Sequence, residues 1–186
     1  IKWPENPKRA SNRFMIKMPD YIGEVYPFRY VELNNYNGEL REIDIIRTNV
    51  NYTFDENASS FISNDSILNQ VWDLCKYSIK ATSFCGYYVD GDRERIPYEA
   101  DAYINQLSHY AVDAEYSIAR NSMKHLLFNP TWPTEWTLYN ILMAWYDYLY
   151  SGDNRFITKY YDELKIKTLL DLTDESGLIS TLTGKQ

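Results

Sequence analysis

The sequence predicts a mainly α-helical fold in which helical hairpins follow a short β-rich segment. From about residue 63 onward, apolar residues recur at the spacing of a helix face, whereas residues 1 to about 55 are rich in proline, β-branched and aromatic residues. The connections between the helical segments are short, and short connections make successive helices antiparallel neighbours. We therefore expect two regions, residues 1–57 and residues 58–186.

Residues 1–57 are predicted to be the last strands of a β-sandwich and a linker. The ranges Tyr26–Leu33 and Glu39–Tyr52 have strand composition, and between them lies Asn37-Gly38, a strong hairpin signal. Two strands are not stable alone. We therefore expect further strands before Ile1, or packing of this segment onto the helices.

Five helices are predicted in the second region, which we expect to be part of a larger helical domain. Several carry apolar residues on nearly every side, which favours a two-layered assembly shaped like an incomplete toroid. The first predicted helix begins after the capping residues Ser63–Ser66. The other four run from Pro97 to Val112, from Glu115 to Phe128, from near Pro133 to Ser151-Gly152, and from Asn154 to Leu172.

Composition excludes several classes of function. The 186 residues carry a net charge of −7, which argues against nucleic acid as a partner. No run of 18 apolar residues predicts a membrane span. Cys75 and Cys85 do not form a metal or disulfide pattern, and His109 and His125 lack ligand spacing, so we expect neither a metal nor a cofactor.

The segment from Tyr88 to Asp101 is the first candidate for chemistry. It holds five carboxylates and two arginines between two apolar helices. Arg93 and Arg95 flank Glu94, so we expect its carboxyl to be held between two guanidinium groups. Paired carboxylates carry out glycoside hydrolysis, in which one protonates the leaving oxygen and another activates water or attacks the sugar. The alternative is a solvated loop of surface ion pairs.

The second candidate is the connection formed by residues 129–136, which carries Trp132, Glu135 and Trp136. Because two helices separate it from the acidic segment, we expect both connections at the same end of the bundle. A tryptophan face beside carboxylates suits a pyranose ring, and 16% of all residues are aromatic. The alternative is that these tryptophans only fill the gap between helices.

These residues resemble the catalytic segment of the bacterial α-L-rhamnosidases, glycoside hydrolase family 78. The similarity lies in Arg93-Glu94-Arg95, the aromatic Tyr98, and Asp101 seven residues after Glu94. The segment Leu68–Trp72 also resembles the opening of the first helix in that family. The resemblance implies part of an (α/α)6 barrel, preceded by the last strands of a β-sandwich.

The resemblance also implies an inverting hydrolase of terminal α-L-rhamnose on plant glycans or glycosides, secreted or periplasmic. It implies that Glu94 is the general acid and that Arg93 orients the carboxylates. Asp90 and Asp101 would bind sugar hydroxyls, while Tyr98 and Trp136 would bound the sugar pocket. The catalytic base of the family would lie beyond Gln186. The resemblance carries no expectation for the oligomeric state.

The chain departs from the family pattern in ways that affect the choice of sugar. Asp90 lies four residues before Glu94 rather than five or six, and Pro97-Tyr98-Glu99-Ala100 replaces the usual Gly-Trp-Thr-Gly. Leu138 stands where a small or acidic residue is usual. Two alternatives therefore stay open, namely a glycosidase or phosphorylase for another sugar on the same barrel, and a non-catalytic carbohydrate-binding helical scaffold.

Overall fold

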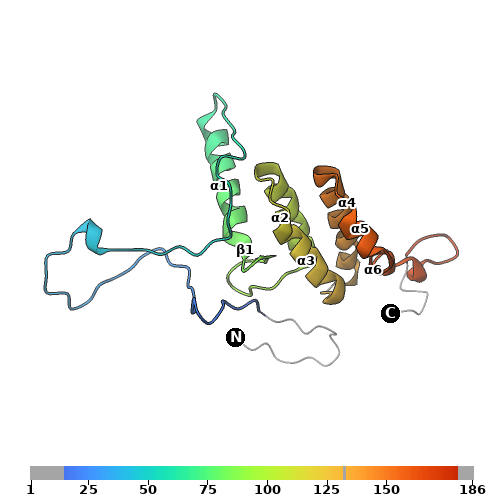
Figure 1. The fold of residues 1–186 in the computed structure, drawn as a ribbon, viewed down its shortest axis with the longest axis horizontal. Helices are drawn as coiled ribbons and strands as arrows, with labels where there is room; N and C mark the ends of the chain where they lie inside the picture. Colours follow the sequence, from blue (N-terminus) through green and yellow to red (C-terminus); the bar gives the residue numbers. More distant parts are fainter. Residues whose placement is uncertain (1–14, 132, 180–186) are drawn as a thin grey trace.

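The structure, a computed structural model, describes residues 15–131 and 133–179, and its helices pack side by side (Figure 1). The helices are α1 (Ser66–Thr82), α2 (Glu99–Val112), α3 (Ser117–Phe128), α4 (Tyr139–Ser151), α5 (Arg155–Lys159) and α6 (Tyr161–Ile166). Three 3-10 turns accompany them, η1 (Glu42–Asp44), η2 (Thr134–Leu138) and η3 (Leu170–Leu172). The prediction of a mainly helical fold is confirmed.

Local signals explain two of the helix boundaries, the start of α1 and the end of α4. The Asp65 side chain caps α1 by accepting from the backbone N–H groups of Ile67 and Leu68. Helix α4 ends at Gly152, which takes the left-handed conformation at φ 68°. The prediction of one helix from Asn154 to Leu172 is wrong, because the helical path is interrupted at Tyr160 and again at Leu169, which has φ 57°.

A tight hairpin joins α1 to the acidic segment. Strand β1 (Ser83–Phe84) pairs antiparallel with β2 (Tyr87–Tyr88), with Ser83 opposite Tyr88. The two linking residues, Cys85 and Gly86, both have positive φ, which is typical of the two-residue turns that match strand twist. The hairpin directs the chain back across the bundle and into the acidic segment.

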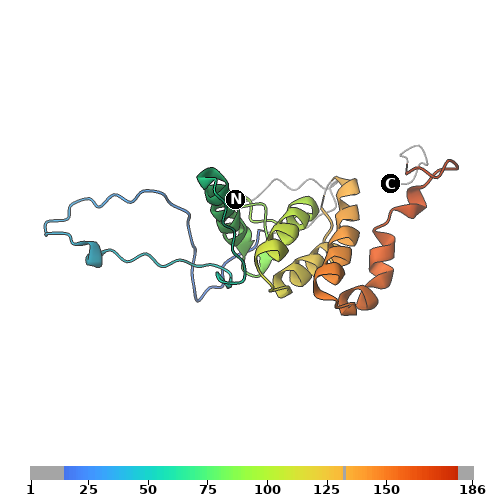
Figure 2. The same cartoon turned by 90° about the horizontal axis from the view of Figure 1, so that it is seen from above.

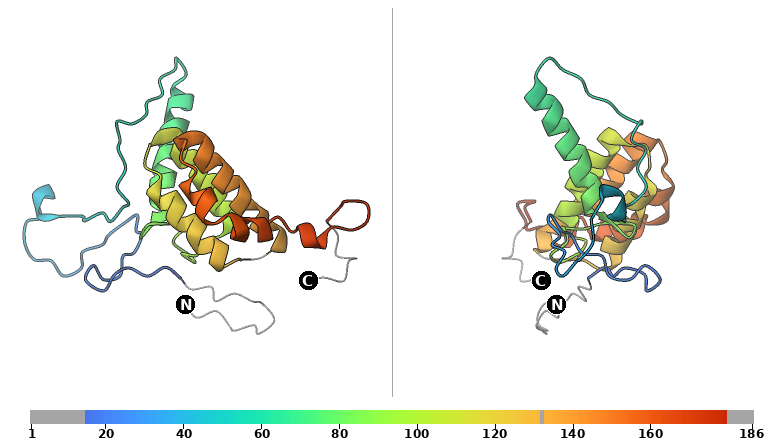
Figure 3. Two further views of the ribbon diagram at one scale, coloured as in Figure 1. Left: turned by 45° about the vertical axis from the view of Figure 1, so that its right-hand side comes forward. Right: turned by 90° about the vertical axis from the view of Figure 1, so that its left-hand side faces the viewer.

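The helices form two layers around one core. Helix α2 packs against α1, α3 and α4, and α3 also packs on α4 and β2. Figure 2 shows the row of helices from above, and Figure 3 shows how closely α2 to α5 are grouped. The buried apolar core comprises Tyr88, Ala102, Tyr110, Ile118, Ala119, Met123, Leu126, Leu127, Met143, Ala144, Tyr160 and Leu164.

Helices α1 and α2 differ in which residues they bury. In α1 the residues Ile67, Val71 and Leu74 lie exposed, and Ile79 is the buried one. In α2 the buried face contains Glu99, Gln106 and His109, so polar side chains take part in the core. Hydrogen bonds to Met143, Tyr88 and Thr131 compensate for part of the lost hydration, while Gln106 Oε1 and His109 Nε2 have no hydrogen-bond partner in the described structure.

The described part of the first region contains no paired strand. Residues 25–50 form a long extended loop that projects from the bundle, with η1 at its far end (Figures 1 and 2). The prediction of paired strands in Tyr26–Leu33 and Glu39–Tyr52 is wrong for this structure. Side chains on both faces stay exposed, Tyr30 at 83% and Ile46 at 87%, so no buried face supports a sheet.

Within the described ranges, no helix is both long and apolar enough to cross a membrane.

Candidate functional site

The acidic segment closes into a compact loop after β2. The backbone N–H of Asp90 donates to the carbonyl of Ile96 at 3.1 Å, and the N–H of Ile96 donates back to Asp90 Oδ1 at 3.0 Å. Gly91, at φ 139°, adopts a backbone conformation that suits glycine. The carbonyl of Gly91 then accepts from the N–H of Arg95 at 3.0 Å. These bonds fix the part of the loop that carries Glu94.

Glu94 is held by two neighbouring side chains. Its Oε1 pairs with Arg93 Nη2 at 2.5 Å, and its Oε2 accepts from Tyr98 Oη at 2.7 Å. The Glu94 side chain is 10% exposed, whereas that of Arg93 is 76% exposed. Residues within four positions of Glu94 therefore orient its side chain, and a small part of its surface stays accessible to a ligand.

Two further carboxyl groups lie close enough to Glu94 to respond to its charge. Burial raises the pKa of Asp90 and of Asp101 above the ordinary value of 3.8, and the negative charge of Glu94 raises both further. The charge of Asp101 also raises the pKa of Asp90. We call Asp90, Glu94 and Asp101 the carboxylate cluster. Asp90 and Asp101 therefore both hold a proton more readily than an exposed aspartate does.

The connection between α3 and α4 meets this loop. The ring of Trp136, in η2, lies edge-on to the ring of Tyr98 with centroids 6.1 Å apart. The prediction that both connections lie at the same end of the bundle is confirmed by this contact. Trp132, the other tryptophan of this connection, lies outside the described residues.

The structure thus brings together the six residues to which the family resemblance assigns roles. Arg93 and Tyr98 contact Glu94, the charges of Asp90 and Asp101 interact with it, and Trp136 contacts Tyr98. Their individual roles in catalysis or binding stay predictions.

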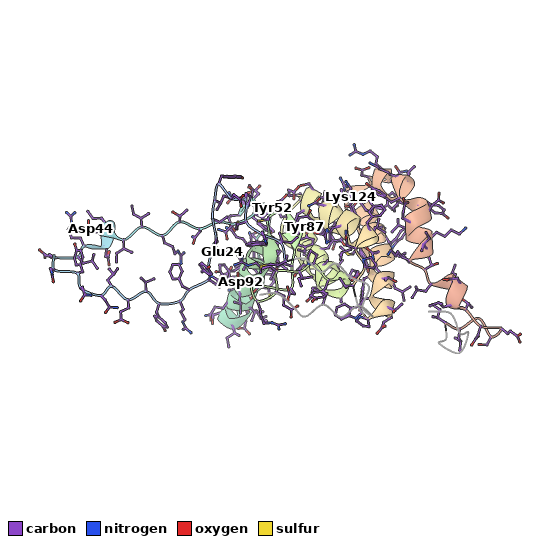
Figure 4. All side chains as sticks on the ribbon, turned by 90° about the horizontal axis from the view of Figure 1, so that it is seen from below. Glu24, Asp44, Tyr52, Tyr87, Asp92 and Lys124 are labelled. Atoms are coloured by element: carbon purple, nitrogen blue, oxygen red, sulfur yellow. The ribbon has the colours of Figure 1, made fainter. Side chains whose placement is uncertain are left out.

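Arg95 does not share Glu94 with Arg93, and the expectation that two guanidinium groups hold that carboxyl is wrong. The Arg95 side chain points away and is 5% exposed. It pairs with Asp92 at 2.7 Å and with Glu24 at 2.5 Å, donates to the carbonyl of Val25, and lies over the ring of Phe84. Figure 4 shows Glu24 and Asp92 near each other and far from Asp44. Arg95 therefore fastens the extended N-terminal segment to the loop.

Sequence reasoning placed Glu99 in the first turn of its helix and missed its contacts. Glu99 is fully buried and accepts hydrogen bonds from both the N–H, at 3.0 Å, and the hydroxyl of Thr131. Thr131 is 32 residues away in sequence, and no short-range pattern links the two.

No three His, Cys, Asp or Glu side chains in the described ranges gather in a way that could hold a metal ion. What the cluster offers chemically is three neighbouring carboxyl groups beside the rings of Tyr98 and Trp136. A positioned carboxylic acid can deliver its proton to a glycosidic oxygen.

The family model for the bacterial alpha-L-rhamnosidase 6 hairpin glycosidase domain matches residues 56–178. Among curated proteins, none matches the chain. The matched range covers more than half of the chain and contains the whole carboxylate cluster together with Tyr98 and Trp136. The chain therefore belongs to the bacterial alpha-L-rhamnosidase six-hairpin glycosidase family.

Proposed function

We propose that this domain hydrolyses a terminal α-L-rhamnosyl bond with inversion of configuration, and that Glu94 is the general acid. The observation that carries the proposal is the environment of Glu94, a carboxyl 10% exposed, held by Tyr98 and Arg93 and flanked by Asp90 and Asp101. Membership of the glycosidase family supports the reaction class.

Each neighbour has a distinct task in this proposal. Tyr98 and Arg93 hold the Glu94 carboxyl in one orientation, from which it delivers its proton to the leaving oxygen. Asp90 and Asp101 accept hydrogen bonds from sugar hydroxyls, and the Trp136 ring bounds the pocket. Orientation of this kind matters because a general acid acts only within hydrogen-bond reach of the oxygen that it protonates.

Inversion requires a second carboxylate that activates water on the opposite face of the sugar. The family resemblance implies that this base follows Gln186 in sequence. In an inverting enzyme it lies roughly 6.5–9.5 Å from the acid, whereas about 5 Å would indicate retention. Secretion or a periplasmic location is likewise a proposal that rests on the resemblance.

The test compares the longest natural form of the protein with its Glu94→Gln variant on two substrates. We expect turnover of a natural rhamnosyl disaccharide to fall by about a hundredfold or more, as the loss of a general acid predicts. An aryl α-L-rhamnoside should lose less, because its leaving group needs little protonation. Glu32→Gln, an exposed change in the projecting loop, is the matched control and should keep full activity.

The configuration of the first product, followed by proton NMR, tests inversion directly. Hydrolysis of another glycoside in place of rhamnosides would keep the reaction class and replace the sugar. Phosphate-dependent cleavage would favour a phosphorylase. Sugar binding without turnover in the longest form would favour the carbohydrate-binding scaffold.

A further inference from the structure

Glu99 is a buried carboxylate that the proposed chemistry does not use. It is the first residue of α2, directly after Tyr98, and none of its surface is exposed. Burying a carboxylate costs free energy unless donors replace its water. Both of its oxygens have such donors, because Oε1 accepts from the N–H of Thr131 and Oε2 accepts from the Thr131 hydroxyl.

Two titratable side chains from other elements lie close enough to Glu99 to respond to its charge. Burial lowers the pKa of His125, near the end of α3, and the charge of Glu99 opposes that change. Burial also lowers the pKa of Lys167, which follows α6, and the charge of Glu99 opposes that change. Glu99 therefore lies where α2, α3, the connection after α3 and the segment after α6 meet.

This position links the two halves of the candidate site. On one side, Tyr98 precedes Glu99 and donates to Glu94. On the other, Thr131 lies in the same connection as Trp136, whose ring contacts Tyr98. The hydrogen bonds that Thr131 donates to Glu99 and the contact of Tyr98 with Trp136 therefore join the same two segments at neighbouring points.

Glu99 is not available to act as a catalytic group itself. Its side chain is closed to water and to any sugar oxygen, and both carboxylate oxygens are already occupied by Thr131. A role in the reaction must therefore pass through the segments that it holds.

We propose that Glu99 is a positioning residue that fixes the Thr131–Trp136 connection against Tyr98 and so sets the sugar pocket opposite Glu94. The effect on catalysis rests on the proposed function. The fastening, by which we mean that the hydrogen bonds between Thr131 and Glu99 hold the connection in place, does not depend on that function. Loss of the fastening should weaken substrate binding more than the chemical step, because Glu94 and Tyr98 keep their own contact.

The first test measures the fastening without reference to any substrate. Amide hydrogen exchange is followed in wild type, Glu99→Gln and Thr131→Val. We expect exchange in residues 129–138 to rise by about tenfold in Glu99→Gln, with α1 unchanged, because an amide replaces a charge-assisted acceptor. Glu135→Gln, an exposed change on the same connection, is the matched control and should leave exchange unchanged.

The second test measures kinetics on a natural rhamnoside with the longest natural form. Glu99→Gln should raise KM about tenfold while kcat stays within about threefold, and the pH profile of kcat should not shift. Thr131→Val should give a smaller increase, and the double variant should equal Glu99→Gln alone, because the two residues share one interaction.

The outcomes separate the two proposals. Unchanged exchange in a natively folded Glu99→Gln protein would overturn the positioning role. Faster exchange without turnover of any glycoside by wild type would leave the fastening intact and refute the proposed function. A kcat loss as large as that of Glu94→Gln, with KM unchanged, would also overturn the positioning role.

Discussion

The phenolic oxygen of Tyr98 lies 2.7 Å from Oε2 of Glu94, four residues earlier in the same loop, and the other oxygen of Glu94 pairs with Arg93. Tyr98 is also the residue whose ring meets Trp136. A single side chain therefore contacts both the proposed acid and the connection between α3 and α4. These two contacts can be separated by removing one oxygen atom.

Tyr98→Phe should keep the ring contact with Trp136 and lose the hydrogen bond to Glu94. We expect kcat on a natural rhamnoside to fall about tenfold with KM nearly unchanged, because an interaction that orients the acid acts on the chemical step. The fold should lose only about 1 kcal/mol, since one partly buried hydrogen bond is removed. Steady-state kinetics and urea unfolding check both values, and an unchanged kcat would contradict the orienting role.

Asp101→Asn should make the protein more stable at neutral pH. Burial, helped by the charge of Glu94, raises the pKa of Asp101 in the folded state above its ordinary 3.8. The folded protein then binds more protons than the unfolded chain in the window above pH 3.8, so stability falls as pH rises through that window. The asparagine removes this penalty.

The measurement is urea unfolding of wild type and Asp101→Asn at several values between pH 4 and pH 7 (about one unit apart). The stability difference in favour of the variant should grow with pH and then level off. Asp162→Asn, an exposed change on α6, should follow wild type throughout. A difference that shrinks with pH would reverse the sign of our argument.

Asp147→Asn should strongly destabilise the bundle. Asp147 is 1% exposed, accepts from Tyr110 Oη at 2.6 Å and pairs with Arg120 Nε at 3.0 Å. Removing its charge leaves the guanidinium of Arg120 without its main partner, and we expect a loss of about 3 kcal/mol in unfolding free energy. Arg155→Ala breaks an exposed pair with Asp153 and should leave the urea midpoint unchanged.

The two arginines beside Glu94 should give opposite results on replacement by alanine. Arg95→Ala removes a buried group with two ion pairs, and we expect a loss of about 2–3 kcal/mol, moderated because its partners are half-exposed. Arg93→Ala removes an exposed group that orients Glu94, so the thermal midpoint should stay while kcat falls about tenfold. Thermal unfolding and kinetics on both variants test the distinction.

The sequence predicted what depends on neighbours along the chain. Asp65 and Gly152 are local signals, and they place helix ends correctly. The carboxylate cluster was predictable for the same reason, because Glu94, Tyr98 and Asp101 follow one another closely. The match of the two connections at one end of the bundle followed from counting the helices between them.

The remaining features depend on contacts that are distant in sequence. Arg95 turns toward Glu24, 71 residues earlier, and Glu99 toward Thr131, 32 residues later. Neither pairing leaves a periodic pattern in either segment. The composition of the segment around Ile46 predicted a strand that the structure does not contain. β-Branched residues favour a strand when another surface packs against them, and no such surface covers this segment in the described structure.

The contacts of Arg95 with residues 16–25 determine where the helical domain can be truncated. The family match begins at residue 56, yet the carbonyl of Arg95 accepts from Ile16, and its guanidinium is matched by Glu24 and Val25. A protein trimmed to the matched range would leave a buried cation with half of its partners missing, directly beside the proposed acid. The family match and the contacts of Arg95 therefore begin at different residues, and a truncated or exchanged form of this domain should keep residues 16–25 together with its helices.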